Sequence, residues 1–273
     1  MVHFLVTVSQ SGHSWQVNMP VKSLLLVWSM LWPVCGLCQA VDTYDDEEHE
    51  FAEPIFFDTS TDIGGDAGEL EINTLPGVFR PQGAKSTFLL GFEFEYVLVK
   101  NFGIELEPTF TLAQGPSRSG GINDLEVELQ YTLWASEQSG LAAGLEVNVP
   151  IGSEALTEDT YELEPFVNYV VQTEWGLSLH PRLNLSLPIQ DNDLELTTNL
   201  GLLLTRGKLM VGTEITTIIE DETMLLLAPQ LGVTLNDWFV GGGVQIPVTD
   251  NNINYNAVLR VIYELSFRDQ PED

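Results

Sequence analysis

Alternation of apolar and polar residues is the feature that most constrains the fold of this sequence. It begins after about the first quarter of the chain and continues almost to the end. Within residues 121–134, for example, Leu125 and Val127 alternate with Glu126 and Glu128. Because successive side chains of a strand point to opposite faces, this period of two predicts β-strands with one apolar and one polar face.

The alternating region, residues 69–267, divides into about twelve expected strands. They are expected near residues 69–79, 86–99, 102–112, 123–135, 141–150, 160–173, 175–188, 193–205, 208–219, 223–235, 238–248 and 253–267. Most have about 10 to 15 residues, whereas strands of soluble sheets typically have about five or six. Tilted strands of about 9–11 residues or more are needed to cross a bilayer, so these lengths favour membrane-spanning strands.

The connections between the expected strands alternate between short and long. Tight turns are expected at residues 100–101, 136–140, 173–175, 206–208 and 236–237. Longer or more polar links are expected at residues 81–85, 113–121, 151–159, 190–193, 220–222 and 249–252. Short turns at one end and longer loops at the other are typical of transmembrane barrels. The prediction is an all-β fold, a transmembrane antiparallel up-and-down β-barrel of about 12 strands.

The alternation alone permits two orientations of the faces. A soluble barrel or sandwich would bury the apolar face, whereas a membrane barrel turns that face outward to lipid. Strand length favours the membrane barrel. Aromatic residues such as Tyr96, Trp134, Trp175 and Trp238 also gather toward strand ends, as interfacial girdles do.

The segment before the barrel contains an expected signal peptide at residues 19–40. Met19 is a possible start, Lys22 supplies a short positive region, and an apolar core precedes small residues near Ala40. Residues 1–18 would then be translated from an upstream start and belong to no fold. Residues 41–68 are expected to form an acidic, solvated leader, and residues 268–273 a C-terminal tail.

Cysteine use limits the chemistry of the mature chain. Cys35 and Cys38 are the two cysteines of the sequence, and both lie within the expected signal peptide. Cleavage would remove them, which excludes a cysteine nucleophile or a metal–thiolate site. A retained membrane anchor and a lipoprotein site are the alternatives for this segment.

The net charge excludes one class of partner. The chain has 10 Lys and Arg against 40 Asp and Glu, for a formal net charge of −30. Such a chain repels phosphate backbones, so we expect no nucleic-acid binding. With 44% hydrophobic and 10% aromatic residues, most of the chain is also expected to fold.

The polar faces of the expected strands carry many carboxylates, which we predict to line the lumen. The proposed lumen-lining residues are Glu93, Glu95, Glu105, Glu107, Glu126, Glu128, Glu146, Glu162, Glu164, Arg182, Glu195, Glu214, Arg260 and Glu264. Glu95 and Glu105 flank a tight turn, and opposed carboxylates about 5 Å apart repel by about 3 kcal/mol at an effective dielectric constant of about 20. Such acids must be hydrated, partly protonated or bridged by cations. The pattern predicts a water-filled, cation-attracting passive channel for small solutes.

Three alternatives remain open from the residues. The lumen could be blocked by loops, which would leave a structural or adhesive barrel. A hydrolase would need a nucleophile and a base, and Ser178 and His180 share a face of one strand. Carboxylates recur on many strands, which favours a lining over an active site, so we predict no enzyme, no cofactor and no metal site. Gly241–Gly243 could mark a bend or a close protein contact.

The last expected strand carries an assembly pattern. Residues 254–267, NYNAVLRVIYELSF, alternate and end at Phe267. This resembles the closing strand of bacterial outer-membrane proteins, whose terminal aromatic residue is read by the barrel assembly machinery. The resemblance implies an assembly signal at Tyr263, Leu265 and Phe267, although RDQPED follows Phe267.

Three stretches resemble one family of bacterial outer-membrane proteins, described as transporters and as the meta-pathway of phenol degradation family. They are residues 53–79 (EPIFFDTSTDIGGDAGELEINTLPGVF), 121–133 and 140–153. The chain departs from the family pattern at Phe57-Asp58-Thr59, where Thr-Asp-Asp is usual, and at Gln130, where Lys is usual. The resemblance implies a channel in the bacterial outer membrane, with outer-membrane lipid, the assembly machinery and small solutes, including neutral aromatics, as partners. It transfers no catalytic residues, and solute identity and oligomeric state stay open.

Overall fold

The computed structural model describes residues 3–10, 13–20, 51, 54–56, 67–83, 85–113, 119–152, 156, 160–189, 194–220, 223–249 and 253–266. The chain divides into two compact units, residues 1–44 and 45–273. Among the described residues, no helix is long and apolar enough to cross a membrane.

The first unit contains a β-hairpin. Strand β1 (His3–Gln10) pairs antiparallel with β2 (His13–Pro20). Residues 1–18 were expected to belong to no fold, and this hairpin contains residues 3–10 and 13–20; their translation from an upstream start stays a prediction. Apart from the end of β2, the expected signal peptide lies outside the described residues, so its cleavage stays a prediction.

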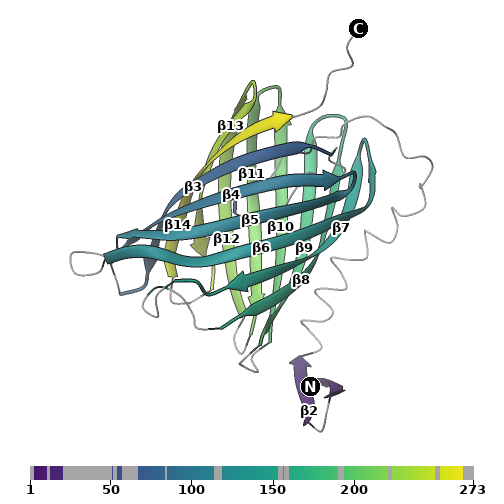
Figure 1. The fold of residues 1–273 in the computed structure, drawn as a ribbon, viewed down its shortest axis with the longest axis vertical. Coiled ribbons are helices and arrows are strands. Elements are labelled where there is room, and N and C mark those ends of the chain that lie inside the picture. The colour runs from purple at the N-terminus through teal and green to yellow at the C-terminus, as the bar shows by residue number, and fades with distance from the viewer. Residues whose placement is uncertain are drawn as a thin grey trace. The chain divides into compact units, whose positions relative to one another are not determined.

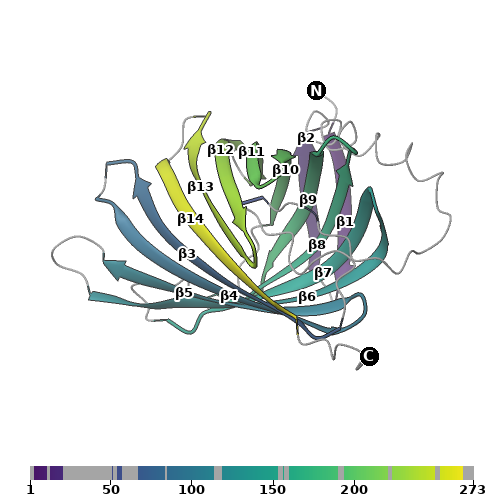
Figure 2. The same cartoon turned by 90° about the horizontal axis from the view of Figure 1, so that it is seen from above.

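Twelve strands close into a single barrel in the second unit. They are β3 (Glu69–Pro81), β4 (Thr87–Val99), β5 (Phe102–Ala113), β6 (Ser119–Ser136), β7 (Ser139–Val149), β8 (Glu162–Gln172), β9 (Leu177–Pro188), β10 (Glu195–Arg206), β11 (Leu209–Ile219), β12 (Thr223–Leu235), β13 (Trp238–Pro247) and β14 (Ile253–Ser266). Consecutive strands pair antiparallel, and β14 pairs with β3 to close the ring (Figures 1 and 2). The predicted fold class, a barrel of about twelve strands, is confirmed.

The observed strand boundaries lie close to the predicted ones. The largest difference is at β6, which begins at Ser119 rather than near residue 123. Glycine weakens strand propensity, so Gly120 and Gly121 look like a loop in the sequence. The pairing of Gly121 with Thr111 nevertheless continues the β5–β6 ladder to this point.

Two tight turns place asparagine in the left-handed region of backbone conformation. Asn101 joins β4 to β5 with a φ of 70°, and Asn236 joins β12 to β13 with a φ of 56°. Asparagine tolerates this conformation better than most non-glycine residues. These turns hold adjacent strands in a fixed register, which positions the side chains described below.

The two faces of the barrel are inverted relative to a soluble protein. Large apolar side chains such as Leu231, 63% exposed, point outward. Polar and charged side chains such as Asn73, Glu214 and Arg260 are at most 1% exposed. Charged residues are almost never buried in soluble domains unless they are paired. The apolar outer face is the face that a membrane barrel presents to lipid.

Aromatic pairs reinforce the outer face near the turns. The rings of Trp238 and Tyr263, which are direct cross-strand partners on β13 and β14, have centroids 4.5 Å apart. The centroids of Trp134 and Tyr169 are 5.7 Å apart. Each such pair contributes about 0.5–1.5 kcal/mol beyond its buried area. Their position agrees with the predicted aromatic residues at strand ends.

Candidate functional site

A continuous row of glutamates crosses six neighbouring strands on the inner face of the barrel. Each member is the direct cross-strand partner of the next, from β3 to β8. We call these six residues the glutamate row: Glu71, Glu95, Glu105, Glu128, Glu146 and Glu164. Because the strand period is two, a register fixed at each pair keeps all six on one face.

The glutamate row concentrates negative charge on side chains of which several have little exposed surface. Glu95 and Glu105 are 3% and 5% exposed. Side chains of direct cross-strand partners are about 4.5–5.5 Å apart at Cβ, and two charges at this separation repel by about 3 kcal/mol at an effective dielectric constant of about 20. The row therefore requires compensating positive charge.

Arg182 on β9 supplies part of that charge at the β6–β7 side of the row. Its Nη2 lies 3.0 Å from Glu128 Oε2 and 3.3 Å from Glu146 Oε2. Its Nε donates to Asn184 Oδ1 at 2.9 Å, and its guanidinium lies 4.3 Å from the centre of the Phe166 ring. The planar guanidinium is held on three sides, so one cation joins two neighbouring carboxylates.

Arg260 on β14 also joins two carboxylates, near the β3–β4 side of the glutamate row. Its Nη2 lies 3.1 Å from Glu93 Oε2 and 3.9 Å from Glu95 Oε1. Asn73 Nδ2 donates to the same two carboxylates, at 2.7 Å and 3.0 Å. Breaking a buried ion pair by removing one partner costs about 3–5 kcal/mol, which makes Arg260 a structural as well as an electrostatic residue.

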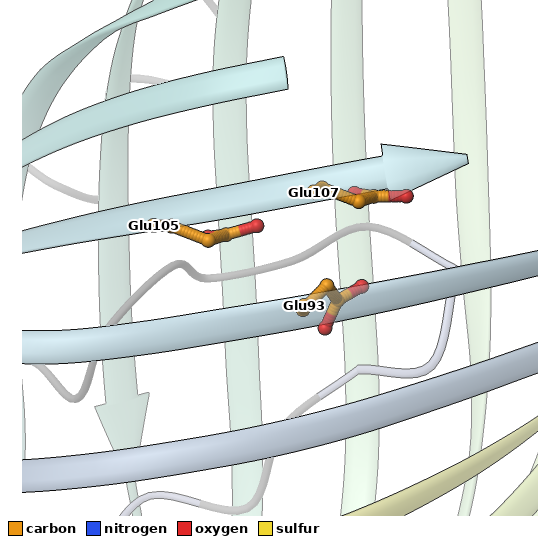
Figure 3. A group of neighbouring side chains, drawn as sticks. All are labelled: Glu93, Glu105 and Glu107. Carbon is orange, nitrogen blue, oxygen red and sulfur yellow. The ribbon is translucent and has the colours of Figure 1, made fainter. Parts of the chain in front are cut away.

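Three carboxylates come close together between these two arginines. Figure 3 shows Glu105 and Glu107 on β5 and Glu93 on the neighbouring strand β4. One oxygen of each lies within 4.8 Å of the others. Oxygen ligands suit hard cations, but carboxylates also gather in this way without an ion. The geometry therefore assigns no resident metal to this group.

A cavity of about 210 Å³ lies against the glutamate row. Its lining residues are Phe56, Glu105, Glu107, Glu126, Glu128, Glu146, Glu164, Arg182, Asn184 and Asn199. Six of these side chains are carboxylates and one is a guanidinium. We call this space the acidic cavity.

A short part of the expected solvated leader lies inside the barrel, which corrects that expectation for residues 54–56. The Ile55 N–H donates to Glu214 Oε1 at 2.7 Å and to Gln230 Oε1 at 2.8 Å. The Phe56 N–H donates to Glu214 Oε1 at 3.0 Å. Arg260 Nη1 donates to the Pro54 carbonyl oxygen at 2.9 Å. We call Glu214, Gln230 and Arg260 the anchor residues.

Apolar contacts support the anchored segment. Ile55, 2% exposed, packs with Leu203 and Met210 in a buried cluster that Phe239 borders. Full burial of such a side chain is worth about 1.5–3 kcal/mol. Further along the barrel wall, Phe51 packs against Ala135, Ala142 and Val170.

Two glycines of β13 make room for the segment. A Cβ added at Gly241 would lie 2.8 Å from Ile55 Cδ1, and one at Gly243 would lie 2.5 Å from Phe56 Cε2. The sequence left a bend and a close contact open for Gly241–Gly243. The structure shows the close contact, with Pro54–Phe56 as the neighbour.

The other predicted lining residues occupy less enclosed positions. Glu107, Glu126, Glu162 and Glu195 are half-buried, whereas Glu264 is exposed near the end of β14. Glu264 pairs directly with Glu71 but lies at the rim of the barrel, so it is not an enclosed lining residue. Whether these residues contact a passing solute stays a prediction.

The predicted assembly signal lies at the end of β14. Tyr263 and Leu265 are within the strand, and Phe267 lies outside the described residues. The use of these residues by the assembly machinery stays a prediction.

Sequence reasoning missed several residues of the inner face. Glu71 was noted only within the family motif, although its place on the polar face of β3 could have identified it. Leu203 lies in the run LGLLLTR, where alternation is hidden, and it is fully buried while Leu202 is 43% exposed. Gln230 is an isolated neutral residue on β12, and no sequence signal marks its role.

The Ser178–His180 pair considered for catalysis is formed but enclosed. Ser178 Oγ and His180 Nε2 are 2.8 Å apart, and both residues are 1% exposed. Within the described part of the chain, no group bonds His180 Nδ1. A nucleophile–base pair usually needs a third group that orients the base, and it needs access to substrate. The pair is therefore a local polar contact of β9.

Several solved structures share this fold. The KdgM porin has a TM-score of 0.51 and 14% identity, over 72% of this chain and 99% of that chain. The COG4313 outer membrane channel from Pseudomonas putida F1 has a TM-score of 0.56 and 9% identity, over 75% of this chain and 98% of that chain. The NanC porin has a TM-score of 0.53 and 10% identity, over 70% of this chain and 98% of that chain. The fold is that of outer-membrane porin barrels.

The family follows from a direct match. Residues 48–264 match the family model described as HAEPLYID-like, and the chain belongs to that family. Read as one-letter code, the letters AEPLYID of that description resemble residues 52–58, AEPIFFD, which include the anchored Pro54–Phe56. Among curated proteins, none matches this sequence. The finer resemblance to the phenol-degradation family stays a prediction.

Proposed function

We propose that this protein is a passive channel of the bacterial outer membrane for small solutes, with a preference for cations and neutral compounds over anions. The observation that carries the proposal is the glutamate row. Six carboxylates follow one another without interruption across half of the strands of the barrel. Rings of carboxylates of this kind select for cations in channels.

The balance of charge on the inner face supports this preference. Arg182 and Arg260 each contact two carboxylates, and further carboxylates line the acidic cavity. The excess negative charge is most simply balanced by mobile cations in a hydrated bore. An anion would meet an unfavourable potential there, while a neutral aromatic solute would not. Neutral phenols therefore remain compatible with this bore, and aromatic carboxylates are disfavoured.

Export and insertion belong to the same proposal. Residues 19–40 would be removed as a signal peptide, and the assembly machinery would read Tyr263, Leu265 and Phe267. The exposed apolar outer face would then contact outer-membrane lipid. Fractionation combined with heat-modifiable gel mobility tests this part, and a compact monomer that stays soluble without detergent would contradict it.

Ion selectivity tests the channel itself. In planar bilayers with a salt gradient, the wild-type protein should give reversal potentials of a cation-preferring pore. The double change Glu105→Gln and Glu128→Gln should lower the cation-to-anion permeability ratio severalfold, because two of six charges are removed. Glu137→Gln, in the exposed turn between β6 and β7, is the matched control and should change nothing. An anion preference of the wild type would refute the proposal.

One observation favours the alternative of a closed structural barrel. Pro54–Phe56 lie inside the barrel and narrow its interior. Both alternatives predict a heat-modifiable membrane protein, so gel mobility does not separate them. Solute-dependent swelling of liposomes containing the protein does, since a closed barrel would give none.

A further inference from the structure

Two short pieces of the chain contact opposite sides of the barrel from within. Phe51 packs on residues of β6, β7 and β8, and Pro54–Phe56 bond to β11, β12 and β14. In the ring, β7 and β13 are six places apart out of twelve, which is the greatest possible separation. Since Phe51 and Phe56 are five residues apart, the chain between them spans at most about 17 Å.

The anchor residues recognise the main chain of this segment. Glu214 and Gln230 accept the two consecutive N–H groups, and Arg260 donates to the carbonyl just before them. Ile55 fills an apolar pocket, and Gly241 and Gly243 leave the space that it and Phe56 occupy. Hydrogen bonds, an apolar pocket and missing Cβ atoms are three independent features that fit one occupant.

The docked segment also adjoins the acidic cavity. Phe56 is one of its lining residues, together with members of the glutamate row. A solute in the acidic cavity would therefore adjoin Phe56 while the segment is docked. Release of the segment would uncover Glu214 and enlarge the space beside the row.

We propose that Phe51 and Pro54–Phe56 form a tethered plug, and that conduction requires the anchor residues to release it. The proposal rests on the channel function proposed above. Its occupant is a part of the same chain, so plug and channel are always present at a ratio of one to one. Docking is the resting state, and opening is an equilibrium whose position the anchor residues set.

A reversible cross-link tests the plug directly. In a chain carrying Cys35→Ser and Cys38→Ser, the pair Ile55→Cys and Leu203→Cys places two thiols in the buried cluster where these two side chains now pack. Oxidation should reduce the bilayer current about tenfold or more, and a reductant should restore it. Each single cysteine variant under the same oxidant is the control. Equal currents before and after a complete cross-link would overturn the proposal.

Removal of Glu214, which accepts two of the hydrogen bonds to the segment, tests whether weaker docking favours the open state. Glu214→Ala should shift the ratio of open to closed states about tenfold toward open, the effect expected for loss of hydrogen bonds to a charged acceptor. Glu214→Gln keeps an acceptor oxygen and should restore most of the closure. Gly241→Ala should also favour opening, whereas Gly242→Ala, whose added Cβ would meet β14 and not the segment, should have no effect.

A readout that needs no current separates this proposal from the channel function. Maleimide should label Ile55→Cys slowly in folded protein and about tenfold faster when Glu214→Ala is added. Equal labelling rates would overturn the plug even if the protein conducts. Faster labelling without current from any variant would refute the channel, and the plug with it. A current that neither the cross-link nor Glu214→Ala changes would refute the plug but not the channel function.

Discussion

The inner face of the barrel has two halves that differ in what their polar side chains bind. On β3–β8 the glutamate row places like charges next to one another, and arginines from the neighbouring strands β9 and β14 contact some of them. On β10–β14 the anchor residues bind main-chain groups of Pro54–Phe56, and glycines reduce the bulk of the wall. The first half concentrates carboxylates, and the second half binds a segment of the chain itself. The same alternating pattern therefore builds both a polar track and a docking surface.

Arg260 joins the two halves, so its removal should have the largest effect. Arg260→Ala removes the buried cation that Glu93 and Glu95 contact, and it removes the donor to the Pro54 carbonyl oxygen. We expect a loss of about 3–5 kcal/mol in the free energy of unfolding. Urea denaturation in lipid vesicles measures it. Arg206→Ala, at the exposed end of β10, is the control, and an equal loss there would show that Arg260 has no special role.

The same substitution should have opposite signs on the two halves. Glu105→Gln removes a charge that lies between two like charges, so we expect the free energy of unfolding to rise by about 1–3 kcal/mol. Glu214→Gln weakens the bonds to the Ile55 and Phe56 amides, so we expect a fall of about 1 kcal/mol. Parallel urea titrations of the two variants compare them. Two changes of the same sign would mean that the halves do not differ as described.

The smallest expected effect concerns the apolar contact of the docked segment. Ile55→Val removes one methylene from the cluster with Leu203 and Met210, and should cost about 0.5–1.5 kcal/mol. Leu231→Val, on the outer face, keeps its lipid contact and should change the urea midpoint by less. The difference between the two midpoints isolates the contribution of docking. A larger change in the urea midpoint for Leu231→Val than for Ile55→Val would contradict a stabilising contact of the docked segment.

Much of the barrel could be predicted from the sequence, because period-two alternation and turn residues are local signals. The tight turn near Asn101 was predicted, but the pairing of Glu95 with Glu105 also depends on a register shift between Val97 and Val99, which no local signal marks. The pairing of Glu105 with Glu128 could not be predicted either, since the link between β5 and β6 is long enough to permit several registers. The continuity of the glutamate row is therefore a property of the folded barrel.

The docked segment could not be predicted for a different reason. Its contacts use main-chain groups, which every residue carries, and its acceptors Glu214 and Gln230 lie far away in the sequence. The one local signal was Gly241–Gly243, which indicates close approach without naming the neighbour. Ile55 and Phe56 were noted for a family motif, but nothing in their spacing predicts burial inside a barrel.

Direct cross-strand pairing has a geometric consequence for the proposed channel. Strands of a barrel tilt by about 35–45° from its axis, so a line drawn perpendicular to them climbs as it circles. With strands about 4.8 Å apart, the five steps from Glu71 to Glu164 rise about 15 Å along the axis. The carboxylates thus follow a helical path around the inner wall, and each one lies on the strand next to that of its neighbour. A cation that follows this path would have a carboxylate close to it at each step from Glu71 to Glu164.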